Sequence, residues 1–112
     1  MGSKAYEIRK LEQKCQDAMK SKDYTSLIIY YRQLFELTND YHFKQNIANI
    51  YYKIFNNIAK ADEIYEEITP HLSNESAFWW QYFEIKTNLN KIYDAVSCTY
   101  NAIKIEINGV KQ

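Results

Sequence analysis

The sequence contains only two glycines and one proline among its 112 residues. Tight β-hairpin turns depend on residues that adopt positive φ, glycine above all, so this chain has little material for hairpins. It is rich instead in tyrosine, isoleucine, leucine, alanine, lysine and glutamate, a composition typical of helices. We therefore predict an all-α protein, in which 46% hydrophobic and 16% aromatic residues suffice for the core of one domain.

Cysteine and histidine are scarce as well, with two of each. Cys15 and Cys98 lie far apart without C-x-x-C spacing, so we expect two buried thiols in preference to a disulfide. His42 and His71 fall on different predicted helices, and neither has a Cys, Asp or Glu at metal-ligand spacing. The sequence also lacks a glycine-rich loop for phosphates. It thus predicts no metal site, no cofactor and no catalytic residue, and a protein that is not an enzyme.

An excess of charge of one sign is also missing, because fourteen basic and fourteen acidic residues cancel. No segment gathers the lysines and arginines that binding to a phosphate backbone requires, so we expect no nucleic-acid partner. Uncharged stretches such as 24–31 are far shorter than the roughly 20 apolar residues of a membrane span. We expect no membrane insertion and a protein of the cytoplasm, where a reducing environment keeps both thiols free.

Three segments of the chain, 23–39, 57–73 and 91–107, align with one another at intervals of 34 residues. In each, a small or aliphatic residue is followed four positions later by an aromatic residue or threonine, and three positions after that by an apolar residue. This spacing places all three residues on one face of a helix. The triplets are Leu27/Tyr31/Leu34, Ala61/Tyr65/Ile68 and Ala95/Thr99/Ala102.

A second amphipathic stretch precedes each of these segments, so each repeat is predicted to be a pair of helices. Short polar side chains that can cap helix N-termini stand before several of them, and Pro70 is expected to shorten its helix. The six predicted helices lie near 5–20, 24–38, 41–55, 58–69, 75–88 and 91–107. The predicted caps are Asp23, Asn57 and either Ser73 or Asn74.

The repeats define the predicted domain organisation. We expect one helical-repeat domain over residues 5–107, preceded by a flexible start at 1–4 and followed by a flexible tail at 108–112. The repeats within it are predicted near 8–40, 41–74 and 75–108.

Asp23-Tyr24 before Leu27, and the run Ala-Asp-Glu-Ile-Tyr at 61–65, make the chain resemble the tetratricopeptide repeat (TPR) family. Its pattern is W-x2-L-G-x2-Y followed by A-x3-F and P over 34 residues. The resemblance covers nearly all of residues 5–107 and departs from the pattern at Cys15 and Phe83, which stand where the family has glycine. It implies a right-handed superhelical stack of antiparallel helix pairs, an α-solenoid of about three repeats and six helices.

The resemblance also implies a function, because the first helices of such pairs line a concave groove that holds a peptide or protein segment. We therefore expect a non-catalytic protein–protein interaction module, a scaffold or adaptor. Trp80 is the strongest candidate contact, since an exposed tryptophan on a concave face is costly unless a partner covers it. The amide of Asn49 suits a peptide backbone, although a solvated asparagine is the alternative. The full set of candidates is Gln16, Gln45, Asn49, Tyr52, Trp80 and Glu84.

A second hypothesis concerns the last predicted helix, which carries more apolar positions than one buried stripe needs. On this alternative the chain is a regulatory or oligomerisation segment of a larger protein and associates through its C-terminal end. The candidate residues for self-association are Val96, Tyr100 and Ile103.

Overall fold

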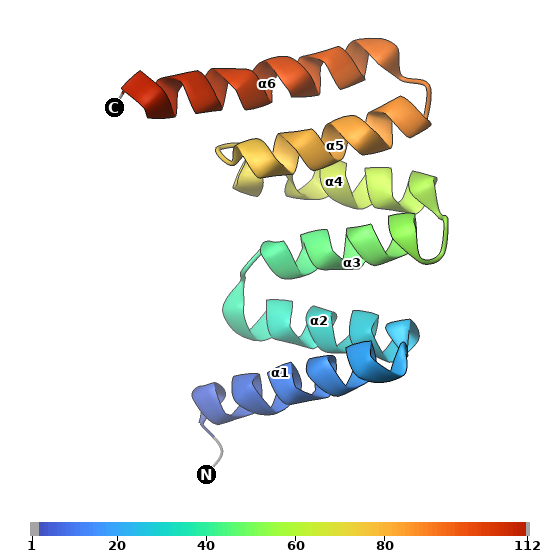
Figure 1. The fold of residues 1–112 in the computed structure, drawn as a ribbon. Helices are drawn as coiled ribbons and strands as arrows, with labels where there is room; N and C mark the ends of the chain where they lie inside the picture. Colours follow the sequence, from blue (N-terminus) through green and yellow to red (C-terminus); the bar gives the residue numbers. More distant parts are fainter. Residues whose placement is uncertain (1–2, 112) are drawn as a thin grey trace.

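The computed structural model describes residues 3–111, and over this range the chain is all-α, with six helices and no strand. Figure 1 shows the helices stacked in chain order, from α1 at one end to α6 at the other. The predicted all-α class and the predicted number of helices are confirmed. The helices are α1 (Lys4–Ser21), α2 (Tyr24–Thr38), α3 (His42–Lys53), α4 (Ile58–Leu72), α5 (Ser76–Asn88) and α6 (Ile92–Lys111).

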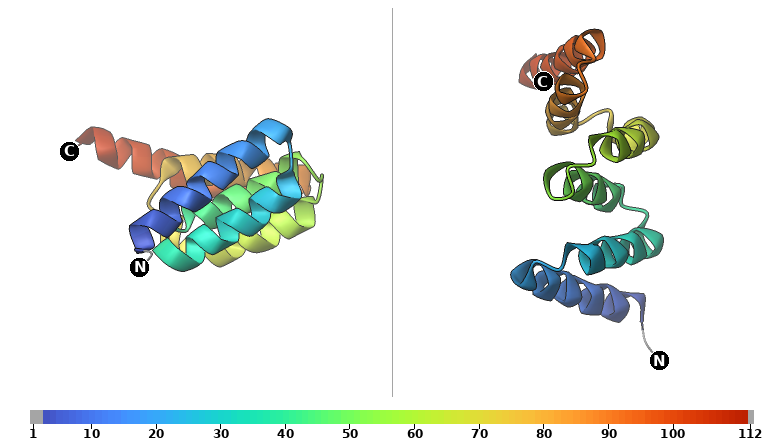
Figure 2. Two further views of the ribbon diagram at one scale, coloured as in Figure 1. Left: turned by 90° about the horizontal axis from the view of Figure 1, so that it is seen from below. Right: turned by 90° about the vertical axis from the view of Figure 1, so that its right-hand side faces the viewer.

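The stack is formed by each helix packing on the next one in the chain, from α1 on α2 through to α5 on α6. Seen from the side, the chain zigzags: α1, α3 and α5 lie on one side of the stack, and α2 and α4 lie on the other (Figure 2). The result is an elongated body with extents of 48 × 36 × 22 Å. This arrangement resembles a helical-repeat protein, in which each unit contacts its neighbours along the stack.

Two of the predicted caps begin their helices as expected. Asp23 Oδ1 accepts a hydrogen bond from the backbone N–H of Ser26 at 3.2 Å, and Asn57 Oδ1 accepts one from Lys60 at 3.1 Å. Each bond satisfies one of the backbone amides that a first helical turn leaves without a partner. Hydrogen bonding from the side chain of Ser26, and then from its backbone N–H, lowers the pKa of the Asp23 carboxyl group.

The two terminal helices extend further than predicted. The hydroxyl of Ser3 accepts a hydrogen bond from the backbone N–H of Tyr6 at 3.1 Å, so α1 begins at Lys4, inside the segment expected to be flexible. At the other end α6 continues through most of the expected tail to Lys111. The remaining positions of the expected flexible ends, 1–2 and 112, lie outside the described residues.

The predicted cap of α5 was wrong. Neither Ser73 nor Asn74 caps this helix; the residue at the cap position is Glu75, and its side chain makes no capping hydrogen bond. Its carboxylate instead faces His42 of α3. The side chain at the cap position of α5 therefore bonds to α3 of the preceding helix pair and not to the first turn of its own helix.

Pro70 was expected to shorten its helix, but α4 continues to Leu72 with the proline inside it. The proline removes one backbone donor, the one that would bond the carbonyl of Glu66. Glu66 is exposed, so water can satisfy that carbonyl, and only the last turn of the helix follows. The cost of the proline is therefore confined to one solvent-accessible bond.

The helix ends show how the chain turns with so little glycine. Among the described residues, those with positive φ are Lys22, Asn39, Asn56 and Asn90, at φ values of 53° to 59°. Asparagine tolerates this left-handed conformation better than other residues with a side chain, because its short amide can bond locally. Three asparagines thus take the positions that glycine usually occupies after helices.

The core consists of two adjoining clusters. One lies between α1, α2 and α3, and the other spans α3 to α6 and includes the fully buried rings of Tyr65 and Phe78. Cys15 belongs to the first cluster and Cys98 to the second, and both are buried thiols, as predicted. Burial raises the pKa of each to about 11, which keeps them protonated and unreactive near neutral pH.

An ion pair joins α4 to α5 beneath the surface. Asp62 Oδ1 lies 2.8 Å from Nζ of Lys86, and both residues are buried. Among the described residues Oδ1 has no hydrogen-bond donor of suitable geometry, so the contact is ionic. Lys91 reaches the second oxygen of Asp62 at 3.4 Å from the solvent side.

Candidate binding face

The α1–α3–α5 side of the stack carries a row of side-chain hydrogen bonds between α3 and the α5 region. The bonded residues are 32 to 36 positions apart in the sequence. Because this separation is nearly constant along the row, α3 and α5 run in the same direction and occupy equivalent places in successive helix pairs. The bonded pairs are His42–Glu75, Gln45–Gln81, Asn49–Gln81, Tyr52–Glu84 and Tyr52–Asn88.

The centre of the row is a partly buried polar network around the hydroxyl of Tyr65. This hydroxyl lies 2.8 Å from Asn49 Oδ1 and 2.9 Å from Gln81 Oε1, and it accepts a bond from Gln45 Nε2 at 3.2 Å. Burial raises the pKa of Tyr65 to about 12, so the hydroxyl keeps its proton as a donor. A satisfied network of this kind fixes the side chains that take part in it.

Asn49 is held by this network and still has hydrogen-bonding capacity. Its amide nitrogen donates to Gln81 at 3.1 Å, and its oxygen accepts from Tyr65. A side-chain amide has two N–H donors and two acceptor lone pairs, so one of each remains. That is the pair of groups needed to bond one peptide unit of an extended ligand, and Asn49 is only partly buried.

Beside Asn49 the surface is hollowed between α1, α2 and α3, with a volume of about 320 Å³. Most of the lining is apolar or aromatic, and two amides and one ammonium group supply the polar part. A concave, mainly apolar surface with a few polar groups is the usual form of a ligand site. The hollow is lined by Met19, Tyr24, Leu27, Tyr31, Asn46, Asn49, Ile50, Lys53 and Ile54.

Four of the six predicted contact residues come together on α3 and α5. Tyr52 donates to Glu84 at 3.1 Å and accepts from Asn88 at 2.7 Å, so these side chains already bond each other at the surface. Gln45 is only 7% exposed, and its amide is used inside the network. We therefore assign Gln45 to the structure of the face, and retain Asn49, Tyr52 and Glu84 as surface groups.

The other two predicted residues take no part in the hydrogen bonds between α3 and α5. Trp80 is 38% exposed, and its indole N–H donates to Glu106 of α6 at 3.0 Å. The ring also packs edge-on against Phe83. These contacts within the protein already offset much of the free-energy cost of exposing a tryptophan. Gln16 is exposed on α1, about one turn before Met19, and lies on the same side of that helix.

Several residues of the hollow were not among the predicted contacts. One of them, Ile54, follows the last residue of α3 and is 45% exposed. The signal for Ile54 was an apolar residue at a helix end, outside the triplets that define the core. Gln81 could not be recognised from the sequence, because its importance comes from partners on α3.

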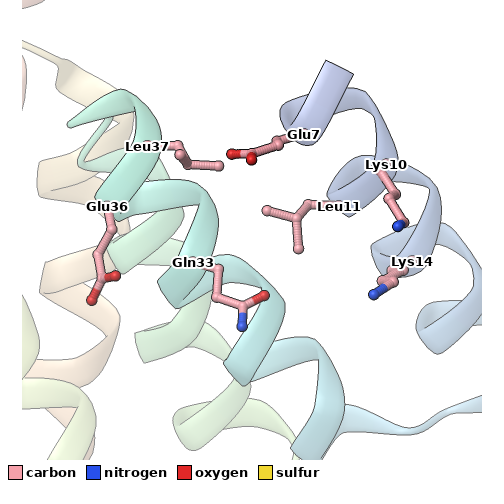
Figure 3. Close-up of a pocket in the computed structure, with 7 residues that line it drawn as sticks. All are labelled: Glu7, Lys10, Leu11, Lys14, Gln33, Glu36 and Leu37. Carbon is pink, nitrogen blue, oxygen red and sulfur yellow. The ribbon is translucent and has the colours of Figure 1, made fainter. Parts of the chain in front are cut away.

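A second depression, of about 530 Å³, lies between α1 and α2 at the N-terminal end of the stack. Figure 3 shows Leu11 and Leu37 extending into it from the two helices. The rest of its lining is polar or charged, with Lys10 and Lys14 opposed by Glu7 and Glu36. It lacks the apolar floor of the hollow beside Asn49, and its balanced charges favour neither an acidic nor a basic ligand. We therefore consider it the weaker candidate.

His42 occupies the outer end of the α3–α5 row and should make stability depend on pH. Nδ1 lies 2.7 Å from Asp40 and Nε2 lies 2.9 Å from Glu75, so both ring nitrogens must be donors, which only the protonated imidazole allows. The bonds to Glu75 and Asp40 raise the pKa of His42. The stabilisation of the folded protein by these two bonds is therefore fully present below about pH 6.5, the pKa of histidine in the unfolded chain. It is lost as the pH rises through the higher pKa that His42 has in the folded protein.

The measurement is urea denaturation of the protein and of His42→Gln at pH 5.5 and pH 8.5. We expect the substitution to cost roughly 0.5 kcal/mol at pH 5.5, a small value because the pair is about half exposed, and much less at pH 8.5. His71→Gln, which leaves this pair intact, is the control. An equal cost of His42→Gln at both pH values would rule out the ionic contribution.

Comparison of the sequence with protein-family models and with curated proteins gives no match to either. Over residues 3–111, no helix combines the length and the apolar character that a membrane span requires. In that same part of the chain, no three His, Cys, Asp or Glu side chains are grouped to hold a metal ion. The function must therefore be inferred from the geometry of the surface.

Proposed function

We propose that this protein is a non-catalytic interaction module that binds a peptide or a segment of another protein on its α1–α3–α5 side. The observation that carries the proposal is the hollow beside Asn49, where an apolar floor adjoins an amide with a donor and an acceptor to spare. The parallel α3 and α5, bonded across 32 to 36 residues, support a TPR-like repeat with a right-handed superhelical stack.

The groups that line the hollow indicate which kind of ligand it would bind. An extended segment would place one apolar side chain against Met19, Leu27 and Ile54, because these residues form the apolar part of the lining. Its backbone would bond Asn49, and an acidic or carbonyl group would suit Lys53 at the rim. Tyr52 and Glu84 lie further along the same face and would contact the continuation of the segment.

A displayed library of random peptides, selected against the purified protein, tests this proposal. We expect enriched peptides with a common apolar position, and we expect Ile54→Asp and Asn49→Ala to weaken their binding about tenfold or more in fluorescence anisotropy. Ile29→Asp is the matched control, since Ile29 lies on α2 and is 47% exposed against 45% for Ile54. Failure to enrich any peptide, or equal affinity for Ile54→Asp and Ile29→Asp, would contradict the assignment of the hollow.

The alternative function, a regulatory or oligomerisation segment of a larger protein, depends on α6 and not on the hollow. The two functions are compatible, because the surfaces lie on different parts of the stack. Val96, Tyr100 and Ile103, the residues predicted for self-association, are all exposed on α6.

A further inference from the structure

Helix α6 has two apolar faces. One is covered by α5 and contains small buried residues: Ala95, Cys98 and Ala102. The other faces solvent, although its side chains are larger. A helix at the end of a stack needs only the first of these faces for its own packing. The second face is therefore expected to be covered by a binding partner.

The exposed residues follow a regular spacing along the helix. Successive members are separated by three, four, three and four positions, which is the heptad spacing of helices that pack side by side. Their exposed fractions run from 42% at Ile103 to 90% at Tyr93. The stripe consists of Tyr93, Val96, Tyr100, Ile103 and Ile107, with Ile92 beside it.

The polar residues of α6 lie outside the stripe. At 100° per residue, Asp94, Ser97, Asn101 and Lys104 fall on the flank of the helix between the face that packs on α5 and the stripe. Asp94 on this flank lies 3.9 Å from Nζ of Lys86 on α5. The last turns of α6 also extend past the N-terminal end of α5 (Figure 1). The stripe is thus continuous, open along its length and free of charge.

The size of the stripe matches that of a protein interface. From their exposed fractions, these six side chains offer an area on the order of 700 Å². A stable interface of standard size buries about 800 Å² on each partner. An exposed apolar patch of this size is also at the upper limit for a monomeric protein.

We propose that the stripe is the contact surface of a homodimer, in which α6 packs antiparallel on α6 of a second copy. The stripe is symmetric about Tyr100: in this arrangement Tyr93 lies opposite Ile107 of the second copy, and Val96 lies opposite Ile103. Each large ring then faces an aliphatic side chain, except at the centre, where the two Tyr100 rings meet. With a two-fold axis of this kind, both copies use the same surface for the contact. No copy of that surface is left free, so the assembly stops at two chains.

Charge agrees with the antiparallel arrangement. Lys104 flanks the stripe on one side and lies near Ser97 of the second copy. Glu106 flanks it on the other side, bonded to Trp80, and lies near Ile92 of the second copy. No like charges are brought together, so the pairing carries no electrostatic penalty.

The first test is sedimentation velocity of the purified chain over a range of concentrations, with a chain mass of 13.4 kDa. We expect a dimer of twice this mass at micromolar concentration, and we expect Val96→Asp with Tyr100→Asp to raise its dissociation constant at least ~100-fold. Ile29→Asp on α2 should leave the dimer unchanged. Circular dichroism of each variant checks that the helices are retained. A monomer at every concentration, a larger assembly, or a dimer that survives the double substitution would overturn the proposal.

The second test distinguishes the direction of the helices by cross-linking. Tyr100→Cys should form an intermolecular disulfide on mild oxidation, because residue 100 lies beside its own copy at the two-fold axis. Tyr93→Cys should not cross-link to itself, but it should form a disulfide when mixed with Ile107→Cys. Efficient self-cross-linking of Tyr93→Cys would mean parallel helices and would overturn the proposed arrangement. Neither test involves the hollow, so either proposal can fail without the other.

Discussion

Replacing Tyr65 by alanine should lower the free energy of unfolding by about 4 kcal/mol, the range found when a buried aromatic ring is removed. The ring is fully buried on α4, with its centroid 5.2 Å from that of Phe78 and 5.1 Å from that of Tyr82. The substitution leaves a cavity between α4 and α5. It also removes the hydroxyl at the centre of the polar network.

Two further substitutions separate these contributions. Tyr65→Phe keeps the ring and removes only the hydroxyl, so it should cost about 1.5 kcal/mol through the amides of Gln45 and Asn49 that lose a partner. Tyr93→Ala removes the same side chain at a position that is 90% exposed, and should change the stability of the monomer by less than about 0.5 kcal/mol. Urea denaturation followed by circular dichroism measures all three. Equal costs for Tyr65→Ala and Tyr65→Phe would mean that packing of the ring contributes little.

The second large effect concerns the ion pair between α4 and α5. Lys86→Met should cost about 3 kcal/mol or more, because the carboxylate of Asp62 stays buried and keeps only the more distant Lys91. The stem of methionine fills most of the space of the lysine, so little of this cost is a cavity. Lys60→Met is the control, since Lys60 pairs with Glu63 on the surface and should lose less than about 0.5 kcal/mol.

A double substitution shows whether charge is the cause. Asp62→Leu with Lys86→Met removes both charges and should cost much less than Lys86→Met alone, because no buried charge is left without a partner. Denaturation of the two single variants and the double variant gives the coupling energy. If the costs of the single variants simply add, the two side chains do not act as a pair.

The helices and their buried faces were predictable because they depend on residues close together in the sequence. The triplet Ala61, Tyr65 and Ile68 was assigned to one helix face from its spacing, and all three residues are fully buried. The caps at Asp23 and Asn57 were recognised for the same reason: a cap and the amide it bonds lie within one turn. Such local patterns determine how their residues are arranged, whatever the rest of the fold.

The candidate binding face could be predicted only in part. Asn49, Tyr52 and Glu84 do lie on one side of the stack, as the repeat spacing indicated. That Gln45 is buried and that Trp80 bonds Glu106 depends on how α3, α5 and α6 are positioned, and residues 26 to 36 positions apart determine those contacts. Lys86 was missed because lysine is rarely buried without a partner, and nothing in the sequence pairs it with Asp62.

The packing of each helix on the next also bears on how the chain reaches its native state. Contacts between neighbours in the chain give a low contact order, which favours rapid folding because little loop entropy is lost before helices meet. Structure can start at any adjoining pair and spread in both directions. The protein can therefore begin to fold during its synthesis, as soon as α1 and α2 have left the ribosome, without waiting for its C-terminal residues.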